Sequence, residues 1–223
     1  MKKLSIIVTG ATGMVGEGVL HECLQSHEVE RVLVINRRPC GVKHPKLTEI
    51  VHQSFHDLAP IEQQLTGFNA CFFCLGVSSV GMSEAAYRQV TYDLTMHVAS
   101  TLVRLNPDMV FTYVTGMHTD STEKGKSMWA RVKGKTENDL MKLPFKAAYM
   151  FRPGYIHPTP GLKNVNKYYK YIAWMYPMLR RLFPKYALTL RELGQAMIRV
   201  AADVPDQRIL EVPDIVRVAG TRR

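Results

Sequence analysis

The feature that most constrains the fold of this chain is a glycine turn between an apolar strand and an amphipathic helix. Residues 4–8 form an apolar run, which ends at the sequence Thr9-Gly10-Ala11-Thr12-Gly13-Met14-Val15-Gly16. After the turn, apolar side chains recur at helical spacing, at Val19, Leu20, Cys23 and Leu24. Glycines let a backbone pass close to a pyrophosphate, and the free amides at a helix start attract its negative charge. The junction therefore predicts dinucleotide binding.

Glycine turns between strands and helices also occur for purely steric reasons, so the triplet gains its meaning from its context. Here it follows a strand rich in Val and Ile and precedes a helix. A second apolar run follows at residues 29–35, as a strand-helix-strand unit requires. This order favours the nucleotide-binding interpretation.

Apolar runs alternate with helical stretches along most of the chain, which predicts an α/β fold with a doubly wound parallel sheet. We expect six parallel strands, at residues 4–8, 29–35, 47–51, 70–75, 109–115 and 145–151. Helices are expected at residues 14–26, 58–65, 83–105, 127–141 and 190–202, and a last short strand at 208–212. Residues 152–161 contain three prolines and two glycines and predict an ordered loop. The 223 residues are expected to form one domain.

Composition limits the classes of partner and compartment. The 29 Lys and Arg against 19 Asp and Glu give a formal charge of +10, but no recognised nucleic-acid-binding module accompanies it, so we expect no nucleic acid. No apolar segment reaches the roughly 18 residues of a membrane span, and the first strand is too short for a signal peptide. Cys71 and Cys74 are three residues apart in a strand, where side chains face opposite ways, which predicts buried thiols and a reducing, cytoplasmic setting. The histidines show no ligand spacing, so no metal site is expected.

Four segments in order resemble the short-chain dehydrogenase/reductase superfamily. They are the glycine turn, the strand end Cys74-Leu75-Gly76, the stretch Ser127-Met128-Trp129-Ala130-Arg131-Val132-Lys133-Gly134, and Phe151-Arg152-Pro153-Gly154. The chain is most similar to small atypical members of the NAD-dependent epimerase/dehydratase type and to the Tat-interacting oxidoreductase group. The resemblance implies an NAD(P)-binding Rossmann fold in which residues 152–188 cover the substrate.

The resemblance also implies which residues bind the cofactor. Gly10, Gly13, Met14, Val15 and Gly16 would line the pyrophosphate, with Thr12 close by. NAD-dependent members place an acidic residue at the end of the second strand, where this chain has Asn36-Arg37-Arg38. Because arginines can bind a 2′-phosphate through paired hydrogen bonds, NADP is favoured and NAD is the alternative. Arg37 and Arg38 can equally be solvated loop charges.

Other positions complete the expected cofactor site. Ser54 stands where the family usually has the aspartate that contacts adenine, and Phe55 offers its backbone and an aromatic wall. Asp57 is expected to cap the next helix. The remaining expected contacts are Leu75 and Gly76, Lys133, and Pro153, Gly154 and Tyr155.

The largest departure from the family is at the catalytic pair. Family enzymes use a tyrosine four residues before a lysine, and this chain has Trp129 and Lys133. The spacing puts both on one helix face, so Lys133 can keep its contact with the nicotinamide ribose. An indole N–H, however, is no acid or base at neutral pH. Thr115 replaces the usual serine, and His118 and Tyr155 are the candidate proton donors.

Two functions follow from this pattern. The first is an NADP(H)-dependent oxidoreductase acting on a small apolar or aromatic carbonyl substrate. The alternative is a non-catalytic NADP(H)-binding regulatory protein, which the loss of the phenol favours. Residues 167–183 are aromatic and basic, and such a stripe is more often core or a homodimer contact than a ligand site. A membrane-surface helix is disfavoured there because Pro177 is expected to break the helical run.

Overall fold

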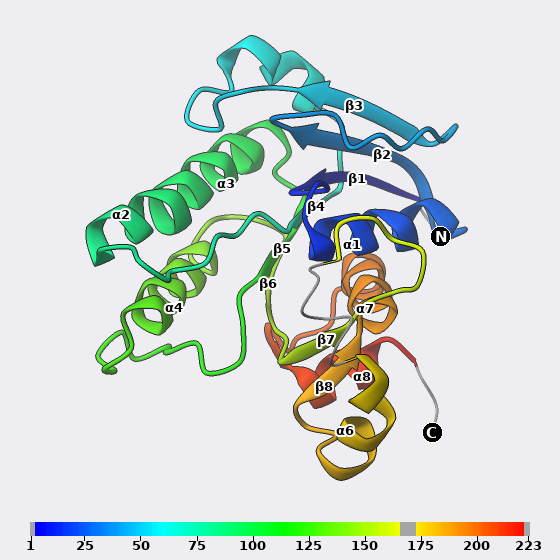
Figure 1. Cartoon of the computed structure of the whole chain (residues 1–223). Coiled ribbons are helices and arrows are strands. Elements are labelled where there is room, and N and C mark those ends of the chain that lie inside the picture. Colours follow the sequence, from blue (N-terminus) through cyan, green and yellow to red (C-terminus); the bar gives the residue numbers. More distant parts are fainter. Residues whose placement is uncertain (1–2, 166–172, 221–223) are drawn as a thin grey trace.

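The computed structural model describes residues 3–165 and 173–220, and it contains a twisted parallel sheet with helices on both faces (Figure 1). The sheet has seven strands in the order β3-β2-β1-β4-β5-β6-β9, and every neighbouring pair is parallel. The strands are β1 (Leu4–Thr9), β2 (Val29–Asn36), β3 (Leu47–Val51), β4 (Ala70–Phe73), β5 (Val110–Val114), β6 (Ala147–Arg152) and β9 (Ile209–Glu211). The predicted doubly wound α/β fold is therefore confirmed.

One face of the sheet is covered by α1 (Met14–Gln25), α7 (Leu190–Asp203) and α8 (Val212–Val218). The other is covered by a short 3₁₀ helix, η1 (Ala59–Leu65), by α4 (Met128–Leu140) and by one long helix. This long helix consists of α2 (Glu84–Arg88), a π-helical turn, η2 (Gln89–Asp93), and α3 (Leu94–Leu105).

The alternation of side chains along the strands divides the interior into two apolar layers. In β1, Ile6 and Val8 pack with α1 and α7, whereas Ile7 packs on the α3 side. The two cysteines of the C-x-x-C sequence divide in the same way: Cys71 belongs to the α3 layer and Cys74 packs against the α1 layer. Both are free thiols, and desolvation raises the pKa of each. The prediction that they face opposite sides is confirmed.

The structure differs from the sequence prediction in several elements, among them two further helices, α6 (Tyr176–Leu182) and α8. The last short strand joins the main sheet beside β6, so the sheet has seven strands and not six. The loop predicted at 152–161 contains β7 (Tyr155–His157), which pairs in parallel with β8 (Ala187–Thr189) as a second small sheet. The helix expected at 58–65 is a 3₁₀ helix. β7 and β8 are only three residues long, too short to produce a clear periodic signal.

Within the part of the chain that the structure describes, no helix combines the length and the apolar character needed to cross a bilayer.

Candidate active site

The glycine turn follows β1, and two of its glycines are fixed by the backbone around them. Gly10 has a φ of +74°, a conformation that L side chains rarely adopt, and a Cβ there would lie 2.8 Å from the carbonyl oxygen of Cys74. A Cβ on Gly16 would overlap the carbonyl oxygen of Gly10. These two glycines therefore let the first turn of α1 pack closely against the ends of β1 and β4.

The middle glycine faces open space. Gly13 is exposed, and a Cβ there would meet only the Gly10 carbonyl oxygen, at 3.5 Å, an ordinary contact. Gly13 is the N-cap of α1, and within the described chain no side chain caps this helix start. The first backbone N–H groups of α1 are therefore not capped by a side chain. Free N–H groups at a helix start are the arrangement that binds a pyrophosphate. Thr12, Met14 and Val15, half-buried, border the same helix start.

The end of β2 carries the two arginines expected to recognise a 2′-phosphate. Arg37 and Arg38 are exposed, and within the described residues neither guanidinium makes an ion pair. The buried Asn36 has a structural partner instead: its amide nitrogen donates to Glu49 at 3.0 Å. The same Glu49 oxygen accepts the backbone N–H of Cys40 at 2.8 Å. The nearest acidic side chain is thus engaged with the protein.

The residues expected around adenine lie in different environments. Ser54 is exposed, whereas the ring of Phe55 is buried in the α3 layer, so Phe55 presents backbone and not a free aromatic face. The carboxylate of Asp57 accepts the Ala59 N–H at 3.1 Å, two residues on. The N-cap of η1 is Leu58, however, and not Asp57 as expected. Leu75 is half-buried, and Gly76 is exposed with open space where a Cβ would be.

Lys133 projects from α4 to the end of β5. Its Nζ donates to the carbonyl oxygen of Thr115 at 2.6 Å. Burial disfavours the charged ammonium and lowers the pKa of Lys133 to about 8, while the charge of Glu137 opposes this shift. Lys133 and Glu137 are four residues apart in α4, so they lie on the same helix face.

A buried ion pair supports this arrangement. Glu137 is fully buried, and its carboxylate accepts hydrogen bonds from the guanidinium of Arg152, at the end of β6, including two from Nε at 3.1 Å. The hydroxyl of Thr115 also donates to Glu137, at 2.6 Å. Arg152 donates further to Glu211 at 3.3 Å and to Ser121. The sequence prediction assigned no role to Glu137 or Arg152; the spacing of Glu137 from Lys133 was the available signal.

Trp129 is half-buried one turn before Lys133, as their spacing requires. His118 is exposed on the loop after β5 with a φ of +68°, and within the described chain its ring makes no hydrogen bond with Lys133 or Thr115. The structure therefore does not bring this candidate proton donor into the Lys133 cluster.

The Pro153–Gly154 turn lies beside the loop after β5, because the Met117 N–H donates to the Pro153 carbonyl at 2.9 Å. Tyr155 follows in β7, and its ring centroid is 6.3 Å from that of Tyr176. Tyr176 also stacks on His157, with centroids 4.1 Å apart. Tyr155 thus lies in an aromatic group at the start of the C-terminal part. Residues 167–172 of the predicted aromatic segment lie outside the described residues.

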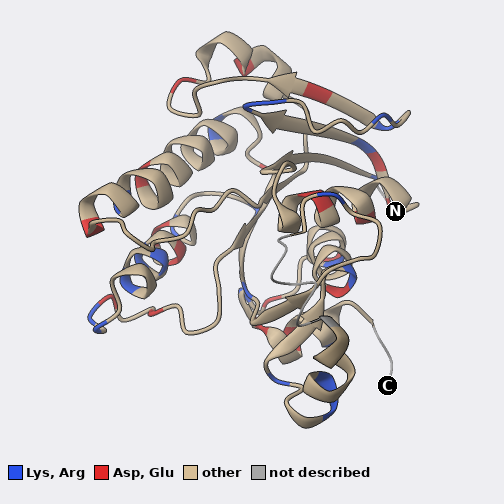
Figure 2. Ribbon diagram, in the orientation of Figure 1, with Lys and Arg blue, Asp and Glu red and all other residues tan. Residues whose placement is uncertain are grey.

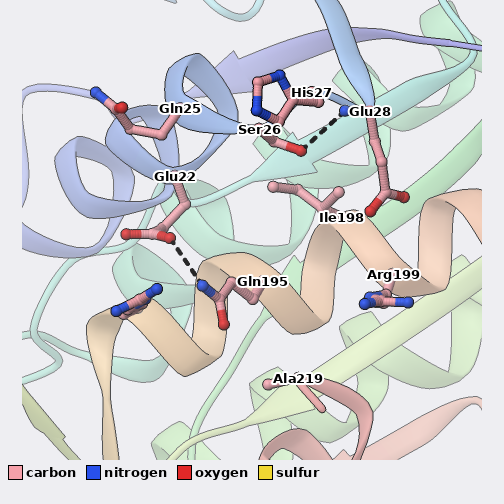
Figure 3. Close-up of a pocket in the computed structure, with 10 residues that line it drawn as sticks. Glu22, Gln25, Ser26, His27, Glu28, Gln195, Ile198, Arg199 and Ala219 are labelled. Carbon is pink, nitrogen blue, oxygen red and sulfur yellow. Dashed lines mark hydrogen bonds between the residues drawn. The ribbon is translucent and has the colours of Figure 1, made fainter. Parts of the chain in front are cut away.

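A separate pocket of about 390 Å³ lies at the other end of α1, between that helix and α7 (Figure 3). Gln195 of α7 donates to Glu22 of α1 at its edge, at 3.3 Å. The 12 residues of α1 place this pocket roughly 18 Å from the glycine turn. It is therefore not part of the predicted nucleotide site.

Solved structures share this fold at low sequence identity. The chain superposes on an NADPH-bound carbonyl reductase from chicken fatty liver with a TM-score of 0.64 at 13% identity, covering 96% of this chain and 98% of that one. It superposes on the enzyme WbmF of Bordetella bronchiseptica, solved in complex with NAD⁺, with a TM-score of 0.65 at 15% identity, covering 98% and 77%.

Relatives are also similar in sequence. Protein FMP52-1, mitochondrial, of Scheffersomyces stipitis is 24% identical over 72% of this chain and 73% of that protein. Protein HTATIP2 of Rattus norvegicus is 23% identical over 69% of this chain, and the match spans 63% of the rat protein. The resemblance to the Tat-interacting oxidoreductase group is therefore confirmed as a similarity.

The similar sequences contradict the expected cytoplasmic location, because FMP52-1 and further FMP52 proteins are named as mitochondrial. The expectation rested on reduced thiols and on the start of the chain. Reduced thiols report a reducing environment and do not by themselves identify a compartment.

The model of the NAD dependent epimerase/dehydratase family matches residues 6–134, from the first strand through the glycine turn to the lysine-bearing helix. This is more than half of the 223 residues, and it contains the glycine turn, the arginines after β2 and Lys133. The chain therefore belongs to the NAD dependent epimerase/dehydratase family.

Proposed function

We propose that this protein is an NADP(H)-dependent oxidoreductase that acts on a small apolar or aromatic carbonyl compound. The observation that carries the proposal is the free surface at Gly13 and the uncapped start of α1, with exposed Arg37 and Arg38 at the end of the neighbouring strand. The glycine turn would hold the pyrophosphate, and the two guanidiniums would bind the 2′-phosphate.

The preference for NADP over NAD rests on charge. An acidic side chain at the end of β2 would repel a 2′-phosphate, but this position is Asn36, and the nearby Glu49 is engaged by Asn36 and Cys40. Two exposed guanidiniums follow immediately. Residues of this charge and exposure fit the additional phosphate of NADP better than they fit a free ribose hydroxyl.

Replacing Arg37 and Arg38 with alanine is expected to weaken NADPH binding by roughly ten- to a hundredfold, because charge-assisted hydrogen bonds to the phosphate are lost. NADH binding should change little, since NADH has no phosphate there. Isothermal titration with both cofactors measures the two affinities. Lys43→Ala, an exposed lysine on the following loop, is the matched control. An equal loss for NADPH and NADH would contradict the phosphate role.

A bound nicotinamide supplies hydride exchange with a carbonyl carbon. The residues of this chain would orient it: Lys133, whose Nζ donates to the Thr115 carbonyl, would bind the nicotinamide ribose, as the family resemblance implies. With a pKa of about 8, Lys133 can donate and accept a proton near neutral pH. Its position next to Thr115 makes these two the candidate catalytic residues, with Tyr155 on the adjoining part. Residues 152–188 would cover the substrate.

The reaction is tested by NADPH consumption with a panel of apolar and aromatic aldehydes and ketones. We expect turnover, reduced on the order of a hundredfold or more in Lys133→Ala because the positioning group is lost. Lys135→Ala is the matched control, since Lys135 lies on the same helix and pairs with Asp139 on its surface, at 2.9 Å. Full turnover in Lys133→Ala would remove Lys133 from the mechanism.

One observation favours a second function, a non-catalytic NADP(H)-binding protein. Trp129 stands at the position of the family's tyrosine, and the Thr115 hydroxyl is engaged by the buried Glu137. An indole cannot exchange a proton at neutral pH. Tight NADPH binding without consumption by any compound of the panel would support this function over the oxidoreductase.

A further inference from the structure

All of the excess positive charge of the chain comes from one segment. No Asp or Glu occurs between Asp139 and Glu192, whereas ten of the 29 Lys and Arg residues do, at Lys142, Lys146, Arg152, Lys163, Lys167, Lys170, Arg180, Arg181, Lys185 and Arg191. The rest of the chain therefore has 19 basic and 19 acidic residues and is neutral. The charge of +10 is thus a property of this segment and not of the molecule in general.

The same segment exposes large apolar side chains around α6 (Tyr176–Leu182). This helix buries none of its residues. Met178 and Leu182 are 53% and 60% exposed, and their spacing of four puts them on one side of the helix. Trp174, in the 3₁₀ turn just before α6, is 77% exposed. Phe183 and Tyr186, just after α6, are each 52% exposed, and their rings contact edge to face. Several large apolar side chains exposed within thirteen residues of the chain point to an interaction site.

Basic side chains border these apolar groups. A pocket of about 660 Å³ beside α6 is lined by Arg180, Arg181, Lys185 and Arg217 together with Pro184, Pro213 and Val216. Arg180 pairs with Glu192 and Arg217 with Asp214. Arg181 and Lys185 are exposed and, within the described residues, make no ion pair. In Figure 2 the ribbon of α6 carries blue and no red.

The α-helix around Pro177 begins only one residue before it, at Tyr176, and a separate 3₁₀ turn at Ala173–Met175 precedes it, so no described α-helix runs through this proline. It lies in the first turn of α6, where a missing N–H removes no helical hydrogen bond. The surface helix is therefore the shorter element that starts at this proline, residues 176–182.

We propose that the α6 surface, made of Trp174, Met178, Leu182, Phe183 and Tyr186 with Arg181 and Lys185, docks the protein on an anionic lipid bilayer. Trp and Tyr are suited to the headgroup level of a bilayer, and Met and Leu to the boundary with the acyl chains. Arg181 and Lys185 would bind anionic headgroups, since no acidic side chain of the segment opposes them. This proposal is independent of the proposed enzymatic activity.

Other occupants fit the α6 surface less well. A second copy docked through the same surface would bring Arg181 and Lys185 against their own equivalents, and like charges repel. A nucleic acid would bind the cations and stack on the rings, but it offers no apolar medium for Met178 and Leu182. Of these occupants, an anionic bilayer satisfies the charge and the aliphatic groups together.

Flotation of the full chain with vesicles tests the proposal. We expect binding to phosphatidylcholine vesicles that contain about one third phosphatidylserine, weak binding to phosphatidylcholine alone, and loss of binding at high salt. Arg181→Gln with Lys185→Gln should weaken vesicle binding about thirtyfold, because each cation near an anionic surface contributes about fivefold. Trp174→Ala with Leu182→Ala should weaken it about a hundredfold.

Matched controls distinguish an effect of the α6 surface from a general effect of positive charge or exposed apolar side chains. Lys43→Gln with Lys124→Gln removes two exposed cations elsewhere, and Val80→Ala trims a side chain that is 87% exposed outside the α6 surface. Both controls should bind vesicles as the unaltered protein does. In a Trp129→Phe background, Trp174 emission should shift to the blue on binding.

Three results would overturn the proposal. The first is no binding to anionic vesicles at low salt by a protein with a normal melting curve. The second is binding that the α6 variants and the controls weaken equally. The third is that the protein does not bind vesicles and instead either forms a dimer that Leu182→Asp dissociates or binds a DNA duplex tightly. Melting curves of each variant show independently that the fold is retained.

Discussion

Glu137→Ala is expected to lower the free energy of unfolding by about 3 kcal/mol, because the buried Arg152 guanidinium loses its closest carboxylate and keeps only the partly exposed Glu211, at 3.3 Å. Arg152 donates to both carboxylate oxygens of Glu137 in a region closed to solvent. The Thr115 hydroxyl loses a hydrogen bond in the same variant. Urea denaturation monitored by circular dichroism measures the change.

Glu84→Ala is the matched control for this loss. Glu84 also pairs with an arginine, Arg131, at 2.6 Å, but its side chain is 52% exposed, and such surface pairs contribute about 1 kcal/mol or less. A second variant distinguishes the cost of an unpaired buried charge from the cost of changing the packing of the site. Glu137→Leu combined with Arg152→Met should recover much of the stability, because no buried charge is left unpaired; Glu211, which also loses Arg152, is 44% exposed. A Glu137→Ala loss no larger than that of Glu84→Ala would contradict the role of the buried pair.

Gly13→Ala is expected to lose NADPH affinity and Gly16→Ala to lose stability, although the two glycines are three residues apart in one turn. Gly13 has a φ of −106°, which alanine adopts, and its Cβ would make an ordinary contact. Gly13→Ala should therefore keep its stability within about 1 kcal/mol. NADPH affinity should fall on the order of a hundredfold, because the methyl group occupies the surface where the pyrophosphate approaches.

Gly16→Ala should instead unfold at lower denaturant concentration. Its Cβ would overlap the carbonyl oxygen of Gly10, so α1 has to move away from the turn, at a cost of about 1 to 3 kcal/mol or more. Melting curves and NADPH titration on both variants separate the two effects. Gly13→Ala with undiminished NADPH affinity would show that this turn does not bind the phosphates.

The parts of the fold that could be predicted are those encoded by neighbours in the sequence. The apolar run ending at Thr9-Gly10 and the period of the following helix predicted β1 and α1. The three-residue spacing of Cys71 and Cys74 predicted opposite faces. In each case the periodicity of a single strand or helix carries the information. The chain order of the family motifs then placed the arginines after β2 and Lys133 on α4.

The buried pair in the site could not be predicted in this way. Glu137 and Arg152 are 15 residues apart, in a helix and in the strand after it. Taken alone in the sequence, each would be expected at the surface, since Glu and Arg are rarely buried without a partner. Only the packing of α4 beside the end of β6 brings them together and closes them from water.

The sequence by itself determined the doubly wound sheet, the open glycine turn and the lysine-bearing helix, because each depends on local periodicity or on the small size of glycine. The tertiary structure alone decided the addition of β9, the pairing of β7 with β8, the Glu137–Arg152 ion pair and the exposure of the α6 side chains. These depend on which distant segments meet. A short strand or a buried charge is stable only when its partner is present.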